Sequence, residues 1–381
     1  MDKYINKLTE QERREFMLRA ISLAEHGRGK TAPNPCVGAL ITRRGEIVAE
    51  SWHKSPGGKH AEVGALEQAR QNGVDLASCT LWVTLEPCNH LGKTPPCTRA
   101  ILDAGIDHVI AGVRDPNQKV AGGGLDYLRK VGIKVEEGVA EPECLDSIRD
   151  FITWQQKSRP YVYLKLASTL DGKIATRYGT PLAISCEQSW LRVHELRSRV
   201  QAVLVGGNTF YADDPGLTAR TPQEVERQPL AVVATSRLPS VDDNQKLLSK
   251  RPQETIFLTL AETKQEDRKK ALLDRGATVW ELSESDAGMD IATALKRLYK
   301  EYNGYYLLCE GGGTLALSLF EQGLVDKFFH ILNPRILGDE KAIDLFSGSR
   351  ETDLQNKSCL RILNQERVGN DLWLTLTSDN R

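Results

Sequence analysis

The stretch from His60 to Cys97 decides the fold of the first half of the chain: it opens with His-Ala-Glu, contains the apolar run LWVTL at 81–85, and ends in EPCNHLGKTPPC. A short apolar run between polar residues is typical of a buried strand. His60 and Cys97 lie where helices are expected to begin, and Cys88 follows the strand. One imidazole and two thiolates are enough to hold zinc in a tetrahedral site with one corner open. We therefore expect a zinc site built from these three side chains.

The neighbouring residues favour a catalytic metal. Glu62 lies two residues after His60, close enough to shuttle protons without being a ligand, and a water in the open corner loses a proton near neutral pH. His-x-Glu, then Pro-Cys, then a second cysteine is the signature of zinc deaminases of nucleobases. Here eight residues separate the cysteines, instead of the commoner two. The alternatives are a closed site with His53 or His90 as fourth ligand, or three unrelated residues. Neither explains Glu62 or the proline before each cysteine.

Strands alternate with helices through the first half of the chain. Thr9 and Glu12 form a capping box, which predicts a helix running to about Glu25. Alternation at this spacing predicts a three-layer α/β domain. The expected strands are 37–41, 47–49, 80–85, 108–113 and 133–139, and the expected later helices begin at His60, Pro96 and Leu125.

Composition limits the classes of partner. The chain has 381 residues, 40% of them hydrophobic and 27% charged, which is ordinary for about two globular domains. A net charge of −1, from 50 basic and 51 acidic residues, leaves no basic footprint for nucleic acid. No signal peptide and no membrane-length apolar run are found, so we expect no membrane partner. Eight scattered cysteines without an export signal indicate the reducing cytoplasm.

The second half of the chain is again predicted to be α/β. We place the domain boundary at the polar linker 157–160, which gives domains of residues 1–156 and 157–381. Glu310 is followed by three glycines and Thr314, between an expected strand and an expected helix. Backbone amides at such a helix start suit a phosphate or pyrophosphate. This turn is not a Rossmann fingerprint.

Eight motifs are spread over most of the chain: PNPCVG at 33–38, HAEV at 60–63, TLEPCNHLGKTPPC at 84–97, DPN at 115–117, LKLA at 164–167, LDGKIA at 170–175, DDPGLT at 213–218 and EGG at 310–312. Together they resemble the bifunctional deaminase–reductases of riboflavin biosynthesis, and the long spacing between the cysteines is that family's own. The resemblance implies a cytidine-deaminase-like α/β domain followed by a dihydrofolate-reductase-like α/β domain. It also implies Zn²⁺ and NADPH as cofactors, a pyrimidine ribosylamino phosphate as substrate, and a homo-oligomer, either a dimer or a tetramer.

The resemblance assigns roles to residues of the deaminase domain. His60, Cys88 and Cys97 would be the zinc ligands, and Glu62 would be the proton shuttle. Asn34, His53 and His90 would contact the substrate.

In the reductase domain, the resemblance makes Lys165 and Asp213 catalytic, with Lys165 donating a proton or orienting the open-chain sugar. The cofactor would contact Ala167, Ala183, Thr209, Asp213, Thr235, Gly312, Gly313 and Thr314. The substrate would contact Pro181, Arg197, Leu217, Arg220 and Glu310. We hypothesise that the run Thr235-Ser236-Arg237 binds the phosphate that distinguishes NADPH from NADH.

One segment departs from the family pattern. Where the family has Ser-x-Trp-Ile-Thr, this chain has Pro181-Leu182-Ala183-Ile184-Ser185. Because Lys165, Asp213, Arg220 and Glu310 are retained, we still expect an active reductase. The alternatives are a deaminase with an inactive second half, a non-enzymatic zinc-stabilised binding protein, and a deaminase of another nucleobase.

Overall fold

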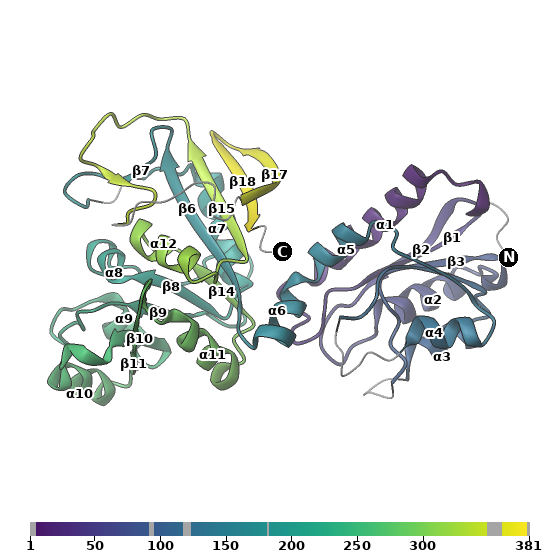
Figure 1. Ribbon diagram of the computed structural model, residues 1–381, viewed down its shortest axis with the longest axis horizontal. Helices are drawn as coiled ribbons and strands as arrows, with labels where there is room; N and C mark the ends of the chain where they lie inside the picture. Colours follow the sequence, from purple (N-terminus) through teal and green to yellow (C-terminus); the bar gives the residue numbers. More distant parts are fainter. Residues whose placement is uncertain (1–4, 91–94, 117–122, 181–182, 349–359, 379–381) are drawn as a thin grey trace. The chain divides into compact units, whose positions relative to one another are not determined.

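In the computed structural model the chain divides into two compact units, residues 1–157 and 158–381, and each is described by itself (Figure 1). The structure describes residues 5–90, 95–116, 123–180, 183–348 and 360–378. Pro181 therefore lies outside the described residues. No described helix is long and apolar enough to cross a membrane.

The first unit is built on a sheet with the strand order β2-β1-β3-β4-β5. β1 pairs antiparallel with both β2 and β3, whereas β3, β4 and β5 run parallel. All side chains of β3 and β4 are buried, because helices cover both faces of the sheet. The strands are β1 (Gly38–Arg43), β2 (Glu46–Trp52), β3 (Thr80–Leu85), β4 (His108–Val113) and β5 (Lys134–Glu137).

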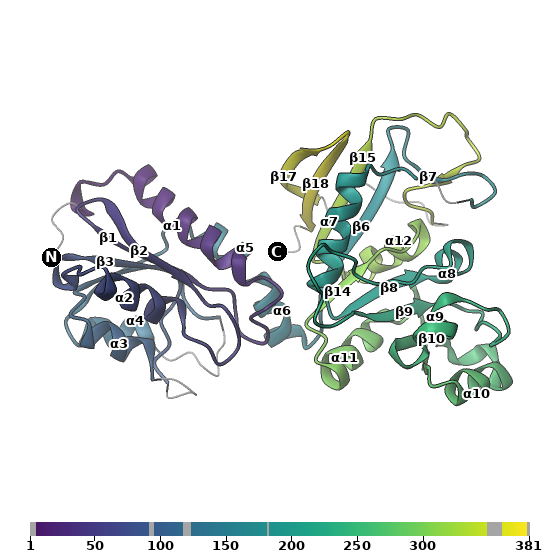
Figure 2. The same ribbon diagram turned by 180° about the vertical axis from the view of Figure 1, so that it is seen from behind.

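Helices α2, α3 and α4 cover one face of this sheet, and α1 and α5 cover the other (Figures 1 and 2). The capping box predicted for Thr9 and Glu12 is present at the start of α1. The core between the sheet and α2 to α4 consists of small and branched apolar residues. The helices are α1 (Glu10–Ala24), α2 (Ala61–Gln71), α3 (Cys97–Asp103), α4 (Gly124–Lys130), α5 (Glu141–Ser147) and α6 (Arg149–Lys157).

The second unit has a larger sheet with the order β11-β10-β9-β8-β14-β6-β15-β18-β17. Neighbouring strands are parallel from β11 to β15, and β18 and β17 then continue the sheet antiparallel. The strands are β6 (Tyr161–Thr169), β8 (Ala202–Gly206), β9 (Leu230–Ala234), β10 (Thr255–Leu260), β11 (Thr278–Leu282), β14 (Tyr306–Cys309), β15 (Lys327–Asn333), β17 (Leu360–Val368) and β18 (Asp371–Ser378).

Helices cover both faces of this sheet as well. α11 and α12 pack on one face, through Leu295 and Leu319 among others, and α7 packs through Val193 on the other. Two short antiparallel pairs, β7 with β16 and β12 with β13, lie outside the main sheet. The remaining bounds are α7 (Glu187–Ser198), α8 (Gly207–Asp213), α9 (Lys246–Lys250), α10 (Glu266–Asp274), α11 (Ile291–Tyr302), α12 (Gly313–Glu321), β7 (Lys173–Ala175), β12 (Glu284–Ser285), β13 (Gly288–Met289) and β16 (Ile343–Asp344).

Candidate active sites

A metal-ligand cluster forms in the first unit where β3 ends and two helices begin. His60 is the N-cap of α2, Cys97 is the first residue of α3, and Cys88 follows β3. Their ligand atoms all lie within 4.8 Å of one another. His60 Nδ1 is 3.2 Å from Cys97 Sγ and 3.6 Å from Cys88 Sγ. A tetrahedral zinc with ordinary bond lengths separates such N and S atoms by about 3.5 Å, so the three donors fit zinc.

The surroundings of the cluster favour thiolate character at Cys88. Its Sγ accepts hydrogen bonds from Cys97, including one from the backbone amide at 3.3 Å, and interacts with His60. Together these hold the pKa of Cys88 below the ordinary value of a thiol. Cys97 is buried, and the neighbouring Cys88 thiolate and the burial both raise its pKa.

Glu62 lies in the first turn of α2, beside the cluster, and only 3% of it is exposed. Burial raises the pKa of its carboxyl group, and the negative charge of Cys88 adds to this effect. A carboxyl group with a raised pKa can take up and return a proton near neutral pH, which is the property a proton shuttle needs.

The proposed substrate contacts of the first unit include a hydrogen-bonded pair on the loops before β1 and α2. Asn34 Nδ2 donates to His53 Nε2 at 3.1 Å, and His53 Nδ1 donates to the Lys59 carbonyl at 3.0 Å. His53 is buried, which lowers its pKa, so the ring is neutral near pH 7. Its ring lies 5.4 Å from that of His60. His90 is exposed on the loop after Cys88.

Glu86 is a positioning residue to which the sequence analysis gave no role. Its two carboxylate oxygens accept the backbone amides of Asp115 and Leu125, each at 3.1 Å. These bonds tie the segments after β4 and at the start of α4 to the loop that carries Cys88. The sequence did contain a sign of this role. Glu86 is an acidic residue between a buried strand and Pro87, and a carboxylate at such a place needs hydrogen-bond donors close to it.

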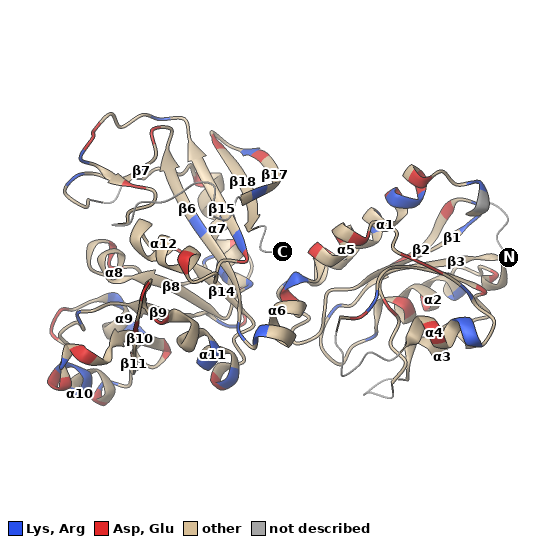
Figure 3. Ribbon diagram, viewed as in Figure 1, with Lys and Arg blue, Asp and Glu red and all other residues tan. Residues whose placement is uncertain are grey.

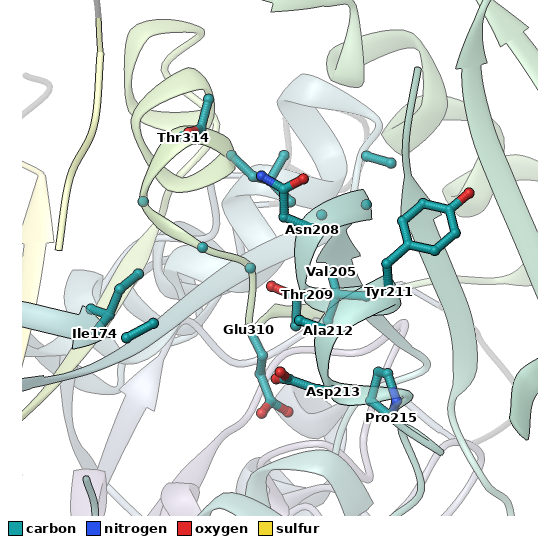
Figure 4. Close-up of a pocket in the computed structure, with 18 of the residues that line it drawn as sticks. Ile174, Val205, Asn208, Thr209, Tyr211, Ala212, Asp213, Pro215, Glu310 and Thr314 are labelled. Carbon is teal, nitrogen blue, oxygen red and sulfur yellow. The ribbon is translucent and has the colours of Figure 1, made fainter. Parts of the chain in front are cut away.

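The second unit contains a pocket of about 1180 Å³ at the carboxyl ends of β6, β8 and β9 and along the segment after β14 (Figure 4). Ligands of open parallel sheets bind at this edge. The pocket lining includes most residues that the resemblance assigned to the reductase: Lys165, Ala167, Arg197, Thr209, Asp213, Leu217, Arg220, Thr235, Glu310, Gly312, Gly313 and Thr314. Ala183 is exposed outside this lining, and its carbonyl accepts a hydrogen bond from Arg335 at 2.6 Å.

A buried ion pair lies in the wall of this pocket. Arg197 Nε and Nη2 donate to the two oxygens of Glu310 at 2.6 and 3.0 Å, and Arg197 Nη1 donates to the Thr218 carbonyl at 3.1 Å. Burial opposes ionisation of Glu310, yet the guanidinium of Arg197 and the charge of Lys165 hold its pKa below the ordinary value. Burial lowers the pKa of Lys165, against the opposing effect of Glu310.

Asp213 and Glu310 point into the same part of the pocket, on the side away from Thr314 (Figure 4). The segment after Asp213 has a constrained backbone, because Asp214 and Leu217 both have a positive φ, 40° and 48°. Such conformations persist only where the surrounding structure holds them, and they are common at ligand sites.

The cofactor side of the pocket is formed by helix starts and small residues. Gly312 is the N-cap of α12, and its neighbours Gly313 and Thr314 begin the helix, where free amides suit a pyrophosphate. A Cβ at Gly207 would lie 2.6 Å from Thr235 Oγ1, so α8 and the end of β9 approach each other closely. Arg237 stacks on the ring of Tyr211, 4.4 Å from its centroid. These features fit a phosphorylated dinucleotide.

Known families match both units. Residues 10–113 match the zinc-binding region of cytidine and deoxycytidylate deaminases, and residues 160–373 match the RibD C-terminal domain. The riboflavin biosynthesis protein RibD of Aquifex aeolicus is 38% identical over 94% of this chain and 96% of its own. The chain belongs to the RibD family. The RibD protein of Escherichia coli is 36% identical over 85% of this chain and 88% of its own.

Solved structures of the family agree along the whole length. A diaminohydroxyphosphoribosylaminopyrimidine deaminase/5-amino-6-(5-phosphoribosylamino)uracil reductase from Thermotoga maritima has a TM-score of 0.78 and 36% identity, over 97% of this chain and 99% of its own. Acinetobacter baumannii RibD has a TM-score of 0.77 and 31% identity, over 98% and 100%. The predicted fold class, family and pair of enzyme activities are thus confirmed, as are zinc and NADPH as cofactors.

Proposed function

We propose that this chain catalyses two consecutive reactions of riboflavin biosynthesis. Residues 1–156 would hydrolyse an amino group from the diaminohydroxyphosphoribosylaminopyrimidine. Residues 157–381 would reduce the ribosyl side chain of 5-amino-6-(5-phosphoribosylamino)uracil to ribityl with NADPH. The observation that carries the first activity is the convergence of His60, Cys88 and Cys97 beside the buried Glu62.

In the deaminase, the chain's own residues bind the substrate and move protons. Bound zinc lowers the pKa of a coordinated water from about 15.7 towards 7. Glu62 would accept one proton from the attacking water and pass it to the ring nitrogen. It would then take the second proton from the resulting hydroxyl and pass it to the amine, so that the C–N bond breaks, ammonia leaves and the carbonyl forms. Asn34 and the neutral His53 would hydrogen-bond the pyrimidine, with His53 held in one tautomer by the Lys59 carbonyl.

In the reductase, bound NADPH would supply a hydride to C1 of the open-chain sugar, which is double-bonded to the side-chain nitrogen. The electron pair of that C=N bond would pass to the nitrogen, and Lys165 would donate one proton to the same nitrogen, giving the ribityl amine. The negative charge of Glu310 favours the protonated form of Lys165. Arg197 donates both Nε and Nη2 to the carboxylate of Glu310, so Arg197 positions Glu310. The phosphate would instead bind Arg220, which is exposed and lines the pocket.

The second candidate is a deaminase with an inactive second unit, favoured only by the departure at 181–185. The pocket, with its paired Arg197 and Glu310, supports the bifunctional enzyme. Purified protein incubated with the diaminopyrimidine phosphate should release ammonia, and addition of NADPH should then give cofactor oxidation and a ribityl product. Ammonia release without NADPH oxidation would favour the second candidate.

The preference for NADPH over NADH would come from Arg237 at the end of β9. Its guanidinium stacks on Tyr211, and the backbone around it is held by hydrogen bonds with Thr235 Oγ1 at 2.8 and 3.2 Å. A guanidinium fixed in this way can bind a phosphate through two parallel hydrogen bonds. Arg237→Ala should raise the KM for NADPH and leave the KM for NADH unchanged; an unchanged preference would dismiss this role.

Location and assembly complete the proposal. Buried free thiols such as those of Cys36, Cys144 and Cys309 suit the reducing cytoplasm. Basic and acidic residues are interspersed along both units, which supports a small-molecule substrate without a nucleic-acid or membrane partner (Figure 3). We propose a homo-oligomer, a dimer or tetramer, and sedimentation of the purified protein tests it.

A further inference from the structure

Trp190 is an aromatic residue of the second unit that the mechanism has not used. It lies in the first turn of α7, lines the reductase pocket, and 43% of it is exposed. An indole ring left this exposed at a pocket wall is an available surface for a flat ligand, because aromatic rings stack on heterocyclic bases.

Trp190 lies at the end of the pocket that contains Lys165. Lys165 Nζ lies over the indole ring, 5.6 Å from its centroid, which is within the range of a cation–π contact. Both residues line the pocket, so a ligand stacked on the indole would lie beside the ammonium. Trp190 is therefore next to the group that would donate the proton.

The other aromatic residues that line the pocket in the described chain are poorly placed for this purpose. Tyr211 is covered by Arg237 on one face, and its hydroxyl donates to the Arg237 carbonyl at 2.7 Å, so it belongs to the cofactor side. Tyr178 follows β7 and is 86% exposed, so few neighbouring residues hold its ring in place. Trp190, in contrast, lies under the ammonium of Lys165.

Helix geometry relates Trp190 to the polar end of the site. Trp190 and Arg197 are seven residues apart on α7, which is two turns and about 10 Å along one face of the helix. One face of α7 thus presents an aromatic ring at one end and the Arg197–Glu310 pair at the other. This arrangement suits a ligand with a flat base joined to a polar chain.

We propose that Trp190 is a specificity-determining residue of the reductase, forming the aromatic wall on which the pyrimidinedione ring of its substrate stacks. The inference rests on the proposed reductase function. Stacking on Trp190 directs the ribosyl chain past Lys165, and it gives the pocket the aromatic surface that Ala183, which lies outside the lining, does not supply.

The experiment compares Trp190→Ala and Trp190→Phe with the full-length wild type in the NADPH-dependent reduction of the deaminated substrate. Loss of stacking on one base should raise the KM for this substrate about tenfold in W190A. The KM for NADPH should stay unchanged, and W190F should recover most of the affinity. Leu191→Ala is the matched control, because Leu191 is 48% exposed on the same helix and does not line the pocket.

A second readout follows binding without turnover. The substrate should quench part of the tryptophan fluorescence of the wild type, and W190F should lose this quenching while it still binds the substrate. Equal rises of both KM values in W190A, an unchanged KM for the substrate, or a changed sedimentation coefficient alone would each overturn the proposal. If the wild type itself does not oxidise NADPH with this substrate, the proposed reductase function fails instead.

Discussion

Glu62 shows how one side chain can be fitted to its task by its surroundings. It is buried at the start of α2, where the helix amides and the neighbouring ligands contribute opposing effects, and its pKa is raised by burial and by the charge of Cys88. In the proposed mechanism His60, Cys88 and Cys97 would hold the metal, whereas Glu62 would transfer protons. The roles can therefore be separated by substitution.

Glu62→Gln should keep zinc bound and reduce deamination by about 10²- to 10⁴-fold, because the amide cannot accept and return a proton. Zinc content and the rate of ammonia release are the measurements. Glu67→Gln is the control, since Glu67 lies on the same helix but is only partly buried, and it pairs with Lys59 at 2.5 Å. Near-normal deamination by zinc-loaded E62Q would contradict the assignment.

The pH dependence of reduction should report on Lys165. As the proton donor, this amine is active only when protonated, so the rate should fall as pH rises through its pKa. Burial lowers that pKa below its ordinary value of 10.5, while Glu310 raises it. Glu310→Gln removes the raising effect, so the alkaline limb of kcat/KM should move to lower pH. A limb that stays in place would show that another group titrates.

At this scale, local motifs were informative and distant pairings were not. His60, Cys88 and Cys97 each stand in a short motif with a recognisable chemistry, so their chemistry could be predicted from the sequence. The pairing of Arg197 with Glu310 could not, because 113 residues separate them and only the sheet brings them together. A binding role for Trp190 could not be predicted either, because a lone aromatic residue on a helix is usually a core residue.

At the scale of elements, the buried strands β3 and β4 could be predicted, whereas the short helix α8 could not. The bounds predicted for β3 and β4, 80–85 and 108–113, agree with the structure, because both are apolar runs between polar turns. α8 was not predicted, since it begins at Gly207, directly after Gly206, and glycines disfavour helices. Packing against β8 and β9 stabilises it.

The close contact between α4 and the loop that carries Cys88 can be tested for its role in zinc binding. A Cβ at Gly124 would lie 1.9 Å from the Pro87 carbonyl oxygen, so Gly124→Ala must move either the helix or the loop. We expect a loss of about 1–3 kcal/mol in stability and reduced zinc content. Gly105→Ala is the comparison: its φ of +75° makes alanine unfavourable, but nothing lies within 4 Å. It should destabilise the protein and retain zinc, and equal zinc loss in both variants would contradict the explanation.

At the scale of the whole molecule, the two chemistries use separate sets of residues. The metal ligands all lie within residues 1–157, and the pocket lining lies within residues 158–381. Removal of zinc with a chelator should therefore abolish ammonia release and leave NADPH oxidation with the deaminated substrate unchanged. Added zinc should restore deamination. Parallel loss of both activities would show that the second unit depends on the metal.

The strand order of the second unit has a consequence for synthesis on the ribosome. All strands of the first sheet come from consecutive segments, so this unit can close as soon as residues 1–157 have emerged. β6 is the first strand of the second unit, yet its partners are β14 and β15, at 306–309 and 327–333. Because long-range parallel pairing is slow and leaves apolar strands exposed, the nascent reductase cannot complete its sheet until about its last third has emerged. A stalled or truncated chain would carry a finished deaminase joined to an unfinished, aggregation-prone sheet.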